Sequence, residues 1–380
     1  MRNLTTYFSI FYYLFIKKEV FIYKISPRFG QAASGIPIIL HELNKYGKIK
    51  NVFFIETNKY IFFNQYLNGL KYNVISNNRI VNILFNYSIK SKINSLTRFS
   101  TSYFLNEVKS FINSNLDQNL IDEILFNNID SNFQSFLKNK FICISIKEKS
   151  YYESNNFFSN YIQPEHEFDT IDRLETSVKY FTDLGYNVIR VGRNLRPSKI
   201  LHKNFFDYAS SSLQSDYCDV MLAKNADFII SNQTGFDMLA AYWFEKSIYQ
   251  YQIRSYRFLI ETHPFKMFNP IIAKKNGKRI GYMDCLKFES ELWTSNNPND
   301  LYESLNKENV TYEQYSDFDI KESFKVFYED YCHNNLHKND KLINDFWTSF
   351  NYYINPIYLK NNRPLSNQNN YNKPNINYLQ

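Results

Sequence analysis

The stretch from Gly185 to Gln250 constrains the fold most, because short apolar runs alternate in it with helix signals. Strands are expected at residues 185–191, 227–231 and 247–251, and helices from about Ser215 to Asn225 and from Phe236 to Phe244. Alternating strands and helices of this length predict a parallel sheet covered by helices on both faces. The fold class that we predict is therefore α/β.

A polar turn follows the strand that ends at Ser231. It contains Asn232, Thr234 and Gly235 and leads into the next expected helix. Ligands of such sheets bind beyond the carboxyl ends of the strands, and the first amides of a helix favour an anion. The hydroxyl and amide side chains would add donors, and Gly235 would let a ligand approach the backbone. The turn therefore predicts an anion-binding site.

Cationic side chains are expected close to this turn. Arg190 and Gly192 end the strand that precedes it in the sequence, and further arginines follow directly. A guanidinium on one strand end and a donor-rich turn on another would suit a pyrophosphate. The alternative is an ordinary strand-to-helix loop with solvated arginines, and the sequence leaves both possibilities open.

The length and charge of the chain limit the classes of function. Its 380 residues are enough for two domains. The net charge of +7 permits an anionic ligand or a membrane surface and does not require nucleic acid, which we exclude as a partner. The four cysteines are widely spaced, as is typical of a reducing compartment without a disulfide framework or zinc site, and no metal site is predicted.

The N-terminal half repeats the strand, loop and helix pattern. A strand is expected at residues 19–26, a loop of small residues at 27–35 and a helix at 36–46. Arg28 and Gly30 in the loop could meet an anion. The spacing differs from the GxGxxG of dinucleotide-binding folds, which argues against a nicotinamide enzyme. A second strand, at residues 51–56, ends in Glu56.

The pattern predicts two Rossmann-like domains with a cleft between them. Residues 1–138 would form the first domain and residues 139–335 the second. Residues 336–360 would contain a C-terminal helix, and the polar residues 361–380 would be a disordered tail. An apolar run at residues 7–16 is too short to span a bilayer. It would be either a helix packed on the protein or a segment at a membrane surface.

The motifs of the second half resemble a bacterial family. The chain is similar to the glycosyltransferases of surface-polysaccharide gene clusters, whose C-terminal half is a GT-B-type nucleotide-sugar domain. The shared features are a GY-x-VIR-x-G strand, an aspartate-tyrosine pair, a DxxL helix and a strand ending in a serine-glycine turn. They lie here at residues 185–192, at Asp207 and Tyr208, at Asp216, Asp219 and Leu222, and at residues 228–235. The small-residue loop at residues 28–35 also resembles the first glycine loop of GT-B proteins.

The chain departs from this family at the end of its first C-terminal strand. The family usually has a His-x-Arg signature there, and this sequence has Ser145, Ile146 and Lys147. Lys147 keeps the positive charge but lacks the fork with which an arginine binds phosphate. A phosphate site remains an implication of the resemblance, with a lysine in place of the arginine.

The resemblance implies a metal-independent GT-B glycosyltransferase that needs no cofactor. Its nucleotide-sugar donor would bind at Lys147, Arg190 to Gly192 and Ser231 to Gly235, and a glycan or lipid-linked acceptor would bind near Arg28 and Gly30. A base must activate the acceptor hydroxyl in an inverting reaction, and Glu56 and His41 are candidates by position. The implied location is the cytoplasm, with peripheral association at the inner membrane face. Two alternatives remain open, namely a non-catalytic nucleotide-sugar-binding homologue and a sugar-nucleotide epimerase on the same fold.

Overall fold

The computed structural model describes most of the C-terminal half and the main elements of the N-terminal half. The described residues are 21–25, 29–46, 52–56, 60–75, 81, 116–129, 133–134, 137–154, 168–193, 196–253, 256, 266–292, 298–333, 341–353 and 372–374. The apolar run at residues 7–16, Arg28 and most of the tail predicted to be disordered lie outside these ranges.

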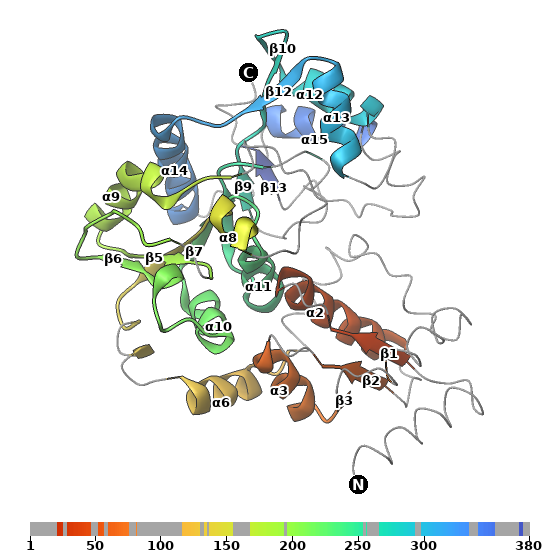
Figure 1. Ribbon diagram of the computed structural model, residues 1–380, viewed down its shortest axis with the longest axis vertical. Coiled ribbons are helices and arrows are strands. Elements are labelled where there is room, and N and C mark those ends of the chain that lie inside the picture. Colours follow the sequence, from red (N-terminus) through yellow and green to blue (C-terminus); the bar gives the residue numbers. More distant parts are fainter. Residues whose placement is uncertain are drawn as a thin grey trace.

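A seven-stranded parallel sheet forms the centre of the C-terminal half (Figure 1). Its strands in chain order are β4 (Phe141–Ser145), β5 (Asn187–Val191), β6 (Phe205–Asp207), β7 (Phe228–Ser231), β8 (Ser247–Gln250), β9 (Lys266–Phe268) and β13 (Asn372–Pro374). They are arranged as β13-β9-β8-β7-β4-β5-β6. If β4 is counted as the first strand, the six strands up to β9 have the order 3-2-1-4-5-6 of the Rossmann fold. The predicted α/β class is confirmed for this half.

Helices cover both faces of this sheet. Because side chains alternate along a strand, Ile142 and Ile144 of β4 point to one face and Cys143 to the other. The first face packs against α9 (Glu175–Asp183) and α14 (Asp317–Cys332), which Figure 1 shows on the same side. The second face packs against α10 (Asp216–Asn225) and α11 (Gly235–Phe244). Both helices confirm the sequence prediction, and Ser215 caps the start of α10, because its hydroxyl accepts from the Cys218 amide at 3.0 Å.

The N-terminal half contains a smaller parallel sheet in the order β1-β2-β3. Its strands are β1 (Phe21–Lys24), β2 (Val52–Ile55) and β3 (Asn73–Ile75), and its helices are α2 (Phe29–Tyr46) and α3 (Ile61–Gly69). The loop predicted at residues 27–35 is wrong from Phe29 onward, since α2 begins there. Ala32 and Ala33 favour a helix, and the two glycines of this segment serve close packing instead of a loop.

Helix α2 packs directly against α11 (Figure 1). A Cβ atom on Gly30 would lie 2.8 Å from the Gly235 Cα, so the two helices approach each other through glycines. On its other side, a Cβ on Gly35 would lie 2.3 Å from the Tyr23 hydroxyl of β1. The helix therefore packs closely against β1 on one side and α11 on the other, and a side chain at either glycine would require its neighbour to shift.

A hydrogen bond between a tryptophan side chain and a backbone carbonyl connects this helix pair. Pro37 lies inside α2 and has no N–H to donate to the Ala33 carbonyl four residues earlier. The indole Nε1 of Trp243, in α11, donates to that carbonyl at 2.6 Å. Trp243 is fully buried, and its ring lies against Phe62, Phe63 and Tyr66 of α3. Trp243 therefore joins α2, α3 and α11.

The two halves share one hydrophobic cluster. It contains buried side chains of α2, β2, α3 and α6 (Gln118–Asn128) together with those of β4, β5, α10 and α11. The N-terminus of α3 is also held by the other half, because the Phe62 amide donates to the Asp216 carboxylate at 2.6 Å. The strands before residue 139 form a sheet of their own, and no strand pairs across this position in the described residues. A cleft between two separate domains stays a prediction.

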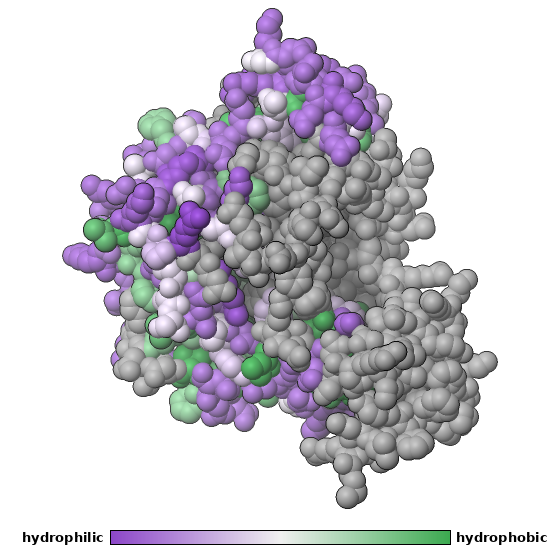
Figure 2. Space-filling model, in the orientation of Figure 1, coloured by the Kyte–Doolittle hydropathy of each residue, from purple (hydrophilic) through white to green (hydrophobic). Residues whose placement is uncertain are grey.

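A further group of elements, here called the upper module, lies at the top of Figure 1. It has an antiparallel sheet in the order β11-β10-β12. Its elements are β10 (Ile272–Lys275), β11 (Lys278–Ile280), α12 (Tyr282–Leu292), α13 (Pro298–Lys307), β12 (Val310–Glu313) and α15 (Lys341–Tyr353). The described residues of this module are mainly hydrophilic on the face shown in Figure 2. Helix α15 matches the C-terminal helix predicted within residues 336–360, whereas the three strands were not predicted.

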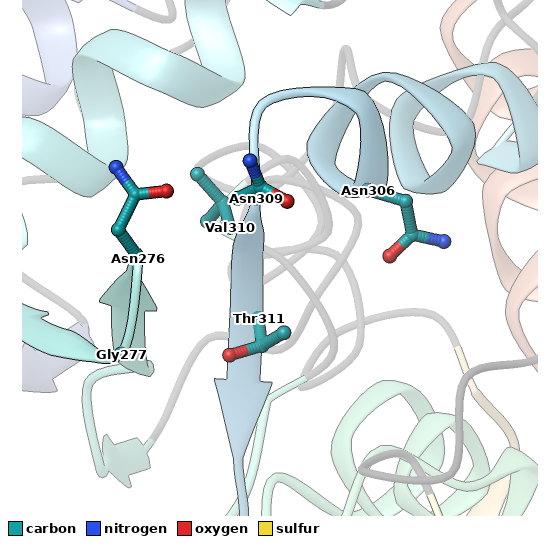
Figure 3. A pocket seen from close by; sticks show the side chains of 6 residues that line it. All are labelled: Asn276, Gly277, Asn306, Asn309, Val310 and Thr311. Atoms are coloured by element: carbon teal, nitrogen blue, oxygen red, sulfur yellow. The ribbon is translucent and has the colours of Figure 1, made fainter.

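A pocket of about 650 Å³ opens in this module (Figure 3). Its lining consists of Asn276, Gly277, Asn306, Asn309, Val310 and Thr311. No lining residue is charged, and none is a predicted site residue. The pocket is therefore separate from the phosphate chemistry that the sequence predicts.

The remaining short elements complete the described fold. They are α8 (Lys149–Ser154) and the 3-10 turns η6 (Ile171–Leu174) and η7 (Tyr208–Ser210). Strand β13 pairs in parallel with β9, so the prediction of a disordered tail is wrong for Asn372 to Pro374. Edge strands pair through backbone groups and need no apolar side chains, which explains why this polar segment can join the sheet.

Candidate functional site

The candidate site lies where the strand order of the large sheet reverses. Strands β5 and β7 both flank β4, and the chain leaves β4 and β7 toward opposite faces. In open sheets of this kind the crevice beyond the carboxyl ends of these strands is where ligands bind. Ser145 and Ser231 end the two strands and lie directly opposite each other in the register. The predicted turn from Ser231 to Gly235 is thus at the switch point.

Asp237, in the first turn of α11, holds this turn together. Its carboxylate is fully buried and accepts hydrogen bonds from the Ser231 hydroxyl, from the Thr234 hydroxyl at 2.9 Å and from the Gln250 amide at 3.2 Å. The sequence analysis missed Asp237. The signal was available, since an acidic residue at the third helical position is a common N-terminal feature.

The hydroxyl groups of the turn form a directed chain. The Ser145 and Thr234 hydroxyls are 2.6 Å apart. A hydroxyl has one proton, and that of Thr234 goes to Asp237, so Ser145 donates to Thr234. The protons of Ser145, Ser231 and Thr234 are all used inside the protein. The prediction that Ser231 and Thr234 donate to a phosphate does not fit this geometry.

The backbone at the start of α11 supplies donors instead. Thr234 is the N-cap residue, and its side chain accepts no hydrogen bond from the first turn. The first amides of a helix have no intrahelical acceptor, and they carry the positive end of the helix dipole. Gln233 precedes them with a φ of +66°, which is rare for a residue with a side chain and turns the chain sharply into the helix.

Lys147 is attached to the same turn. Its backbone amide donates to the Asn232 Oδ1 at 2.6 Å, so the segment after β4 and the turn after β7 are fixed to each other. The Lys147 side chain is almost fully buried, and its ammonium lies 5.5 Å from the centre of the Phe168 ring. The structure therefore brings Lys147 together with Ser231 to Gly235, whereas their role in binding a phosphate stays a prediction.

Arg190 is placed differently from its prediction. Its side chain is 1% exposed. One terminal nitrogen donates to Glu148 at 2.5 Å, and the other donates to both carboxylate oxygens of Asp207 at 3.0 and 2.9 Å and to the Arg196 carbonyl at 2.8 Å. Burial raises the pKa of Glu148, and Arg190 counteracts that rise. This guanidinium is committed to two protein carboxylates, so we do not assign it to a phosphate.

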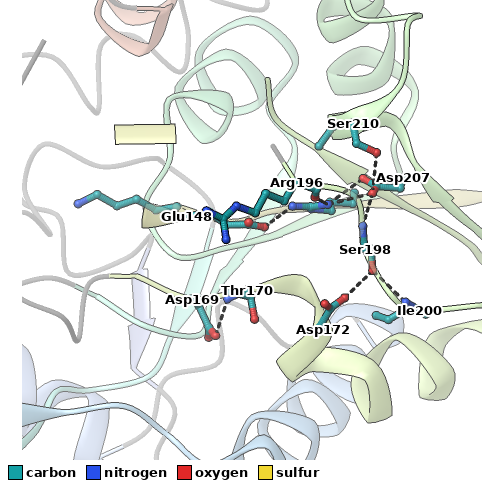
Figure 4. A network of polar contacts seen from close by, with 12 residues as sticks. Glu148, Asp169, Thr170, Asp172, Arg196, Ser198, Ile200, Asp207 and Ser210 are labelled. Carbon is teal, nitrogen blue, oxygen red and sulfur yellow. Dashed lines mark hydrogen bonds and ion pairs between the residues drawn. The ribbon is translucent and has the colours of Figure 1, made fainter. Parts of the chain in front are cut away.

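The Arg190 network extends to the loop that follows β5. Figure 4 shows Ser198 between two carboxylates: its amide donates to Asp207 at 2.8 Å and its hydroxyl to Asp172 at 2.7 Å. Gly192, at the end of β5, has a φ of +148°, a value that favours glycine. These contacts fix the path of the loop, and Gly192 has a conformational role there.

A second ion pair, beside the end of β5, fixes α10. Arg193 donates to the Asp219 carboxylate at 2.6 Å, and the Tyr208 hydroxyl donates to the same group at 2.8 Å. Burial raises the pKa of Asp219, and Arg193 opposes the rise. The aspartate-tyrosine and DxxL motifs of the sequence thus meet each other, and they position the helix that packs beside α11.

A further carboxylate, Asp169, lies near the segment that follows β4. Asp169 pairs with Arg173, and its Oδ2 accepts from the Tyr251 hydroxyl at 3.2 Å. The Asp169 amide donates to the Lys147 carbonyl at 3.1 Å. This cluster connects the end of β8 to the segment after β4, and the sequence analysis did not identify it because the partners are 82 residues apart.

The candidate acceptor-side residues are only partly described. Glu56 is half-buried at the end of β2, and its amide donates to the Ile75 carbonyl at 2.9 Å. His41 lies in α2, and its side chain is outside the described part. Gly30 contacts Gly235, so it belongs to a helix contact and does not line an open loop. The catalytic roles of Glu56 and His41 stay predictions.

None of the described helices is long and apolar enough to cross a membrane. Within the same ranges no three His, Cys, Asp or Glu side chains are grouped as metal ligands would be.

Comparisons with known proteins add little to this geometry. No family model matches the chain, and no curated protein matches it at a significant level. Among solved structures, the chain is similar to a dodecameric iron-containing heptosyltransferase, TibC, in complex with ADP-D-β-D-heptose. The TM-score is 0.36 and the identity 9%, over 82% of this chain and 77% of that one. A likeness of this degree carries no inference about fold or activity.

Proposed function

We propose that the protein is a glycosyltransferase that uses a nucleotide-sugar donor. The observation that carries the proposal is the rigid polar turn at the switch point of a Rossmann-ordered sheet. In this class of sheet that position binds nucleotides, with the phosphates at a helix N-terminus. The donor diphosphate would therefore bind at the start of α11.

The amides of α11 and the Lys147 ammonium would share the charge of the diphosphate. When the glycosidic bond to the donor breaks, negative charge grows on the leaving diphosphate. Fixed amide dipoles and one cation in a buried site stabilise such charge without reorganising. The buried carboxylate of Asp237 opposes an anion, but its position orders the turn that presents the amides. Lys147 is the positive group that offsets it.

The acceptor side of the proposal rests on the sequence resemblance. A surface-glycan or lipid-linked acceptor would bind the N-terminal half, and Glu56 or His41 would take the proton of its attacking hydroxyl. The sugar, the acceptor and the stereochemical course are not part of the proposal. A non-catalytic nucleotide-sugar-binding protein would use the same donor site, so binding and turnover need separate assays.

The test is a binding screen of the purified protein. Thermal shift and calorimetry with ADP, UDP, GDP and CDP, and with their sugar conjugates, should identify one preferred base. A ligand that binds only the folded state raises the free energy of unfolding by about 2.7 kcal/mol at 100 times its dissociation constant. Lys147→Met should weaken that ligand about tenfold or more, as expected for loss of a charged contact.

The neighbouring lysine provides the matched control. Lys149 lies two residues later and is exposed, so Lys149→Met should leave the affinity unchanged. Equal affinities of wild type and Lys147→Met would remove Lys147 from the site. If wild-type protein that is folded binds none of these compounds, the proposal of a nucleotide-sugar enzyme is wrong. Binding without sugar transfer or hydrolysis would favour the non-catalytic alternative.

A further inference from the structure

Gln252 follows the strand next to the candidate phosphate site. It comes two residues after β8, whose last residue, Gln250, contacts Asp237. The Tyr251 amide donates to the Ser231 carbonyl at 3.1 Å, so the chain still runs alongside β7 at that point. The Tyr251 hydroxyl contacts Asp169, whose backbone is bonded to Lys147. Gln252 therefore lies at the carboxyl edge of the sheet, directly after Tyr251, whose amide and hydroxyl both contact the candidate site.

The side chain of Gln252 is buried, with only 5% of its surface exposed. Within the described part of the chain, neither its Nε2 nor its Oε1 has a hydrogen-bond partner. Nearly all buried polar groups in native proteins have a partner, and an orphaned buried group carries its full desolvation penalty. Its neighbours differ in this respect, since the Gln250 amide and the Tyr251 hydroxyl are both bonded. A ligand that supplies both a donor and an acceptor would remove the penalty.

We infer that Gln252 reads the nucleobase of the bound nucleotide and so determines which donor the protein accepts. This inference rests on the proposed function and adds the recognition of the base. The amide is neutral and presents a donor and an acceptor side by side. A phosphate offers acceptors only and would leave Oε1 unsatisfied. The edge of a base has a donor and an acceptor in one plane, and glutamine pairs with such an edge through two parallel hydrogen bonds.

The position of the residue agrees with this assignment. The diphosphate would lie at α11, which follows β7, and β8 is the next strand outward from the switch point. A base extending from the phosphates along the carboxyl edge toward β8 reaches the end of that strand. Burial of Gln252 also excludes water from the pair, which increases the penalty for a base with the wrong pattern.

The experiment compares wild type with Gln252→Leu, which removes both polar atoms at similar size. Calorimetry would use the preferred nucleoside diphosphate, its sugar conjugate and inorganic pyrophosphate. We expect the affinity for the nucleoside diphosphate to fall roughly 5- to 150-fold, the range for a lost bidentate contact to a base. Pyrophosphate should bind both proteins equally. The melting temperature without ligand should stay the same or rise, because an unpartnered amide is removed.

A second variant tests the pattern of donors and acceptors. Gln252→Glu keeps the shape and replaces the amide donor by an acceptor, so it should change the order of preference among ADP, UDP, GDP and CDP. The control is Gln118→Leu, at an exposed position of α6, which should change neither affinity nor preference.

Four results would overturn the inference. Unchanged nucleotide affinity in Gln252→Leu would remove the residue from recognition while leaving the proposed function intact. A loss confined to the sugar conjugate would assign Gln252 to the sugar instead of the base. An equal loss for pyrophosphate would indicate a disturbed phosphate site. Failure of the wild type to bind any nucleotide would overturn this inference together with the proposed function, and the screen without variants would already show that.

Discussion

We expect the hydrogen bond from Trp243 to the Ala33 carbonyl to contribute measurably to the free energy of unfolding. Trp243→Phe removes the indole N–H and leaves the Ala33 carbonyl without its donor inside a buried helix contact. An unsatisfied buried group costs about 1–3 kcal/mol. The smaller ring also leaves a cavity, which adds a further cost. The free energy of unfolding should therefore fall by more than the cavity alone would explain.

Pro37 allows the two costs to be separated. In Pro37→Ala the new N–H can donate to the Ala33 carbonyl, as in a regular helix. Trp243→Phe should then cost about 1–2 kcal/mol less in the Pro37→Ala background than in the wild type. The cavity cost is common to both backgrounds and cancels in this double-mutant cycle. Urea unfolding of the four proteins, followed by far-ultraviolet circular dichroism, would measure the difference.

Trp347 serves as the control for the cycle. It is a buried tryptophan of α15 in a different hydrophobic cluster, so Trp347→Phe should cost the same with and without Pro37. Effects at distant sites add to within about 0.5 kcal/mol. If the cost of Trp243→Phe is also the same in both backgrounds within that limit, the missing proline N–H is not the reason why the indole bonds to Ala33.

Two more predictions concern the same packing. Gly30→Ala should lower the free energy of unfolding by about 1–3 kcal/mol, because its Cβ would lie 2.8 Å from the Gly235 backbone. Gly69→Ala should lower the free energy of unfolding by less, although its Cβ would lie only 2.7 Å from a methyl group of Leu120, because the end of that side chain can move. Equal losses for the two variants would contradict this reasoning. The third prediction uses Tyr23, whose pKa burial raises from 10.0 to about 12. The folded protein resists ionisation of this group, so stability present below pH 10 is lost as the pH rises toward 12. The free energy of unfolding of Tyr23→Phe, measured relative to wild type, should be about 1.4 kcal/mol higher at pH 11 than at pH 8. If urea unfolding gives the same difference between the two proteins at both pH values, this prediction is refuted.

The sequence predicted the central strands and their helices well because they are fully buried. Strands β4, β5, β7 and β8 are short apolar runs, and a parallel sheet covered on both faces requires such runs. The predictions failed at the edges. Strands β6, β9 and β13 have three residues each and join the sheet through backbone pairing, for which the side chains give no signal. The strands of the upper module were missed for the same reason.

Glycines misled the analysis in the N-terminal half. Gly30 and Gly35 were interpreted as a loop that a ligand could approach, since both uses of glycine look alike in a sequence. The structure shows that what approaches them is protein, namely the Gly235 backbone and the Tyr23 hydroxyl. The glycines in a sequence show where another group can approach the backbone closely. Only the fold shows whether a helix or a ligand makes that contact.

The candidate site shows the same ambiguity for polar groups. Arg190, Ser231 and Thr234 have the chemistry to bind a phosphate, and all three use it on neighbouring carboxylates. Their contacts order the loop after β5 and the turn after β7, so their effect on a ligand would be through the backbone that they position. This shifts the predicted phosphate contacts to the amides of α11 and to Lys147. It also explains why Arg190→Ala is a poor test of binding: the loss would leave Glu148 and Asp207 buried without their shared cation, and the fold would suffer before any ligand did.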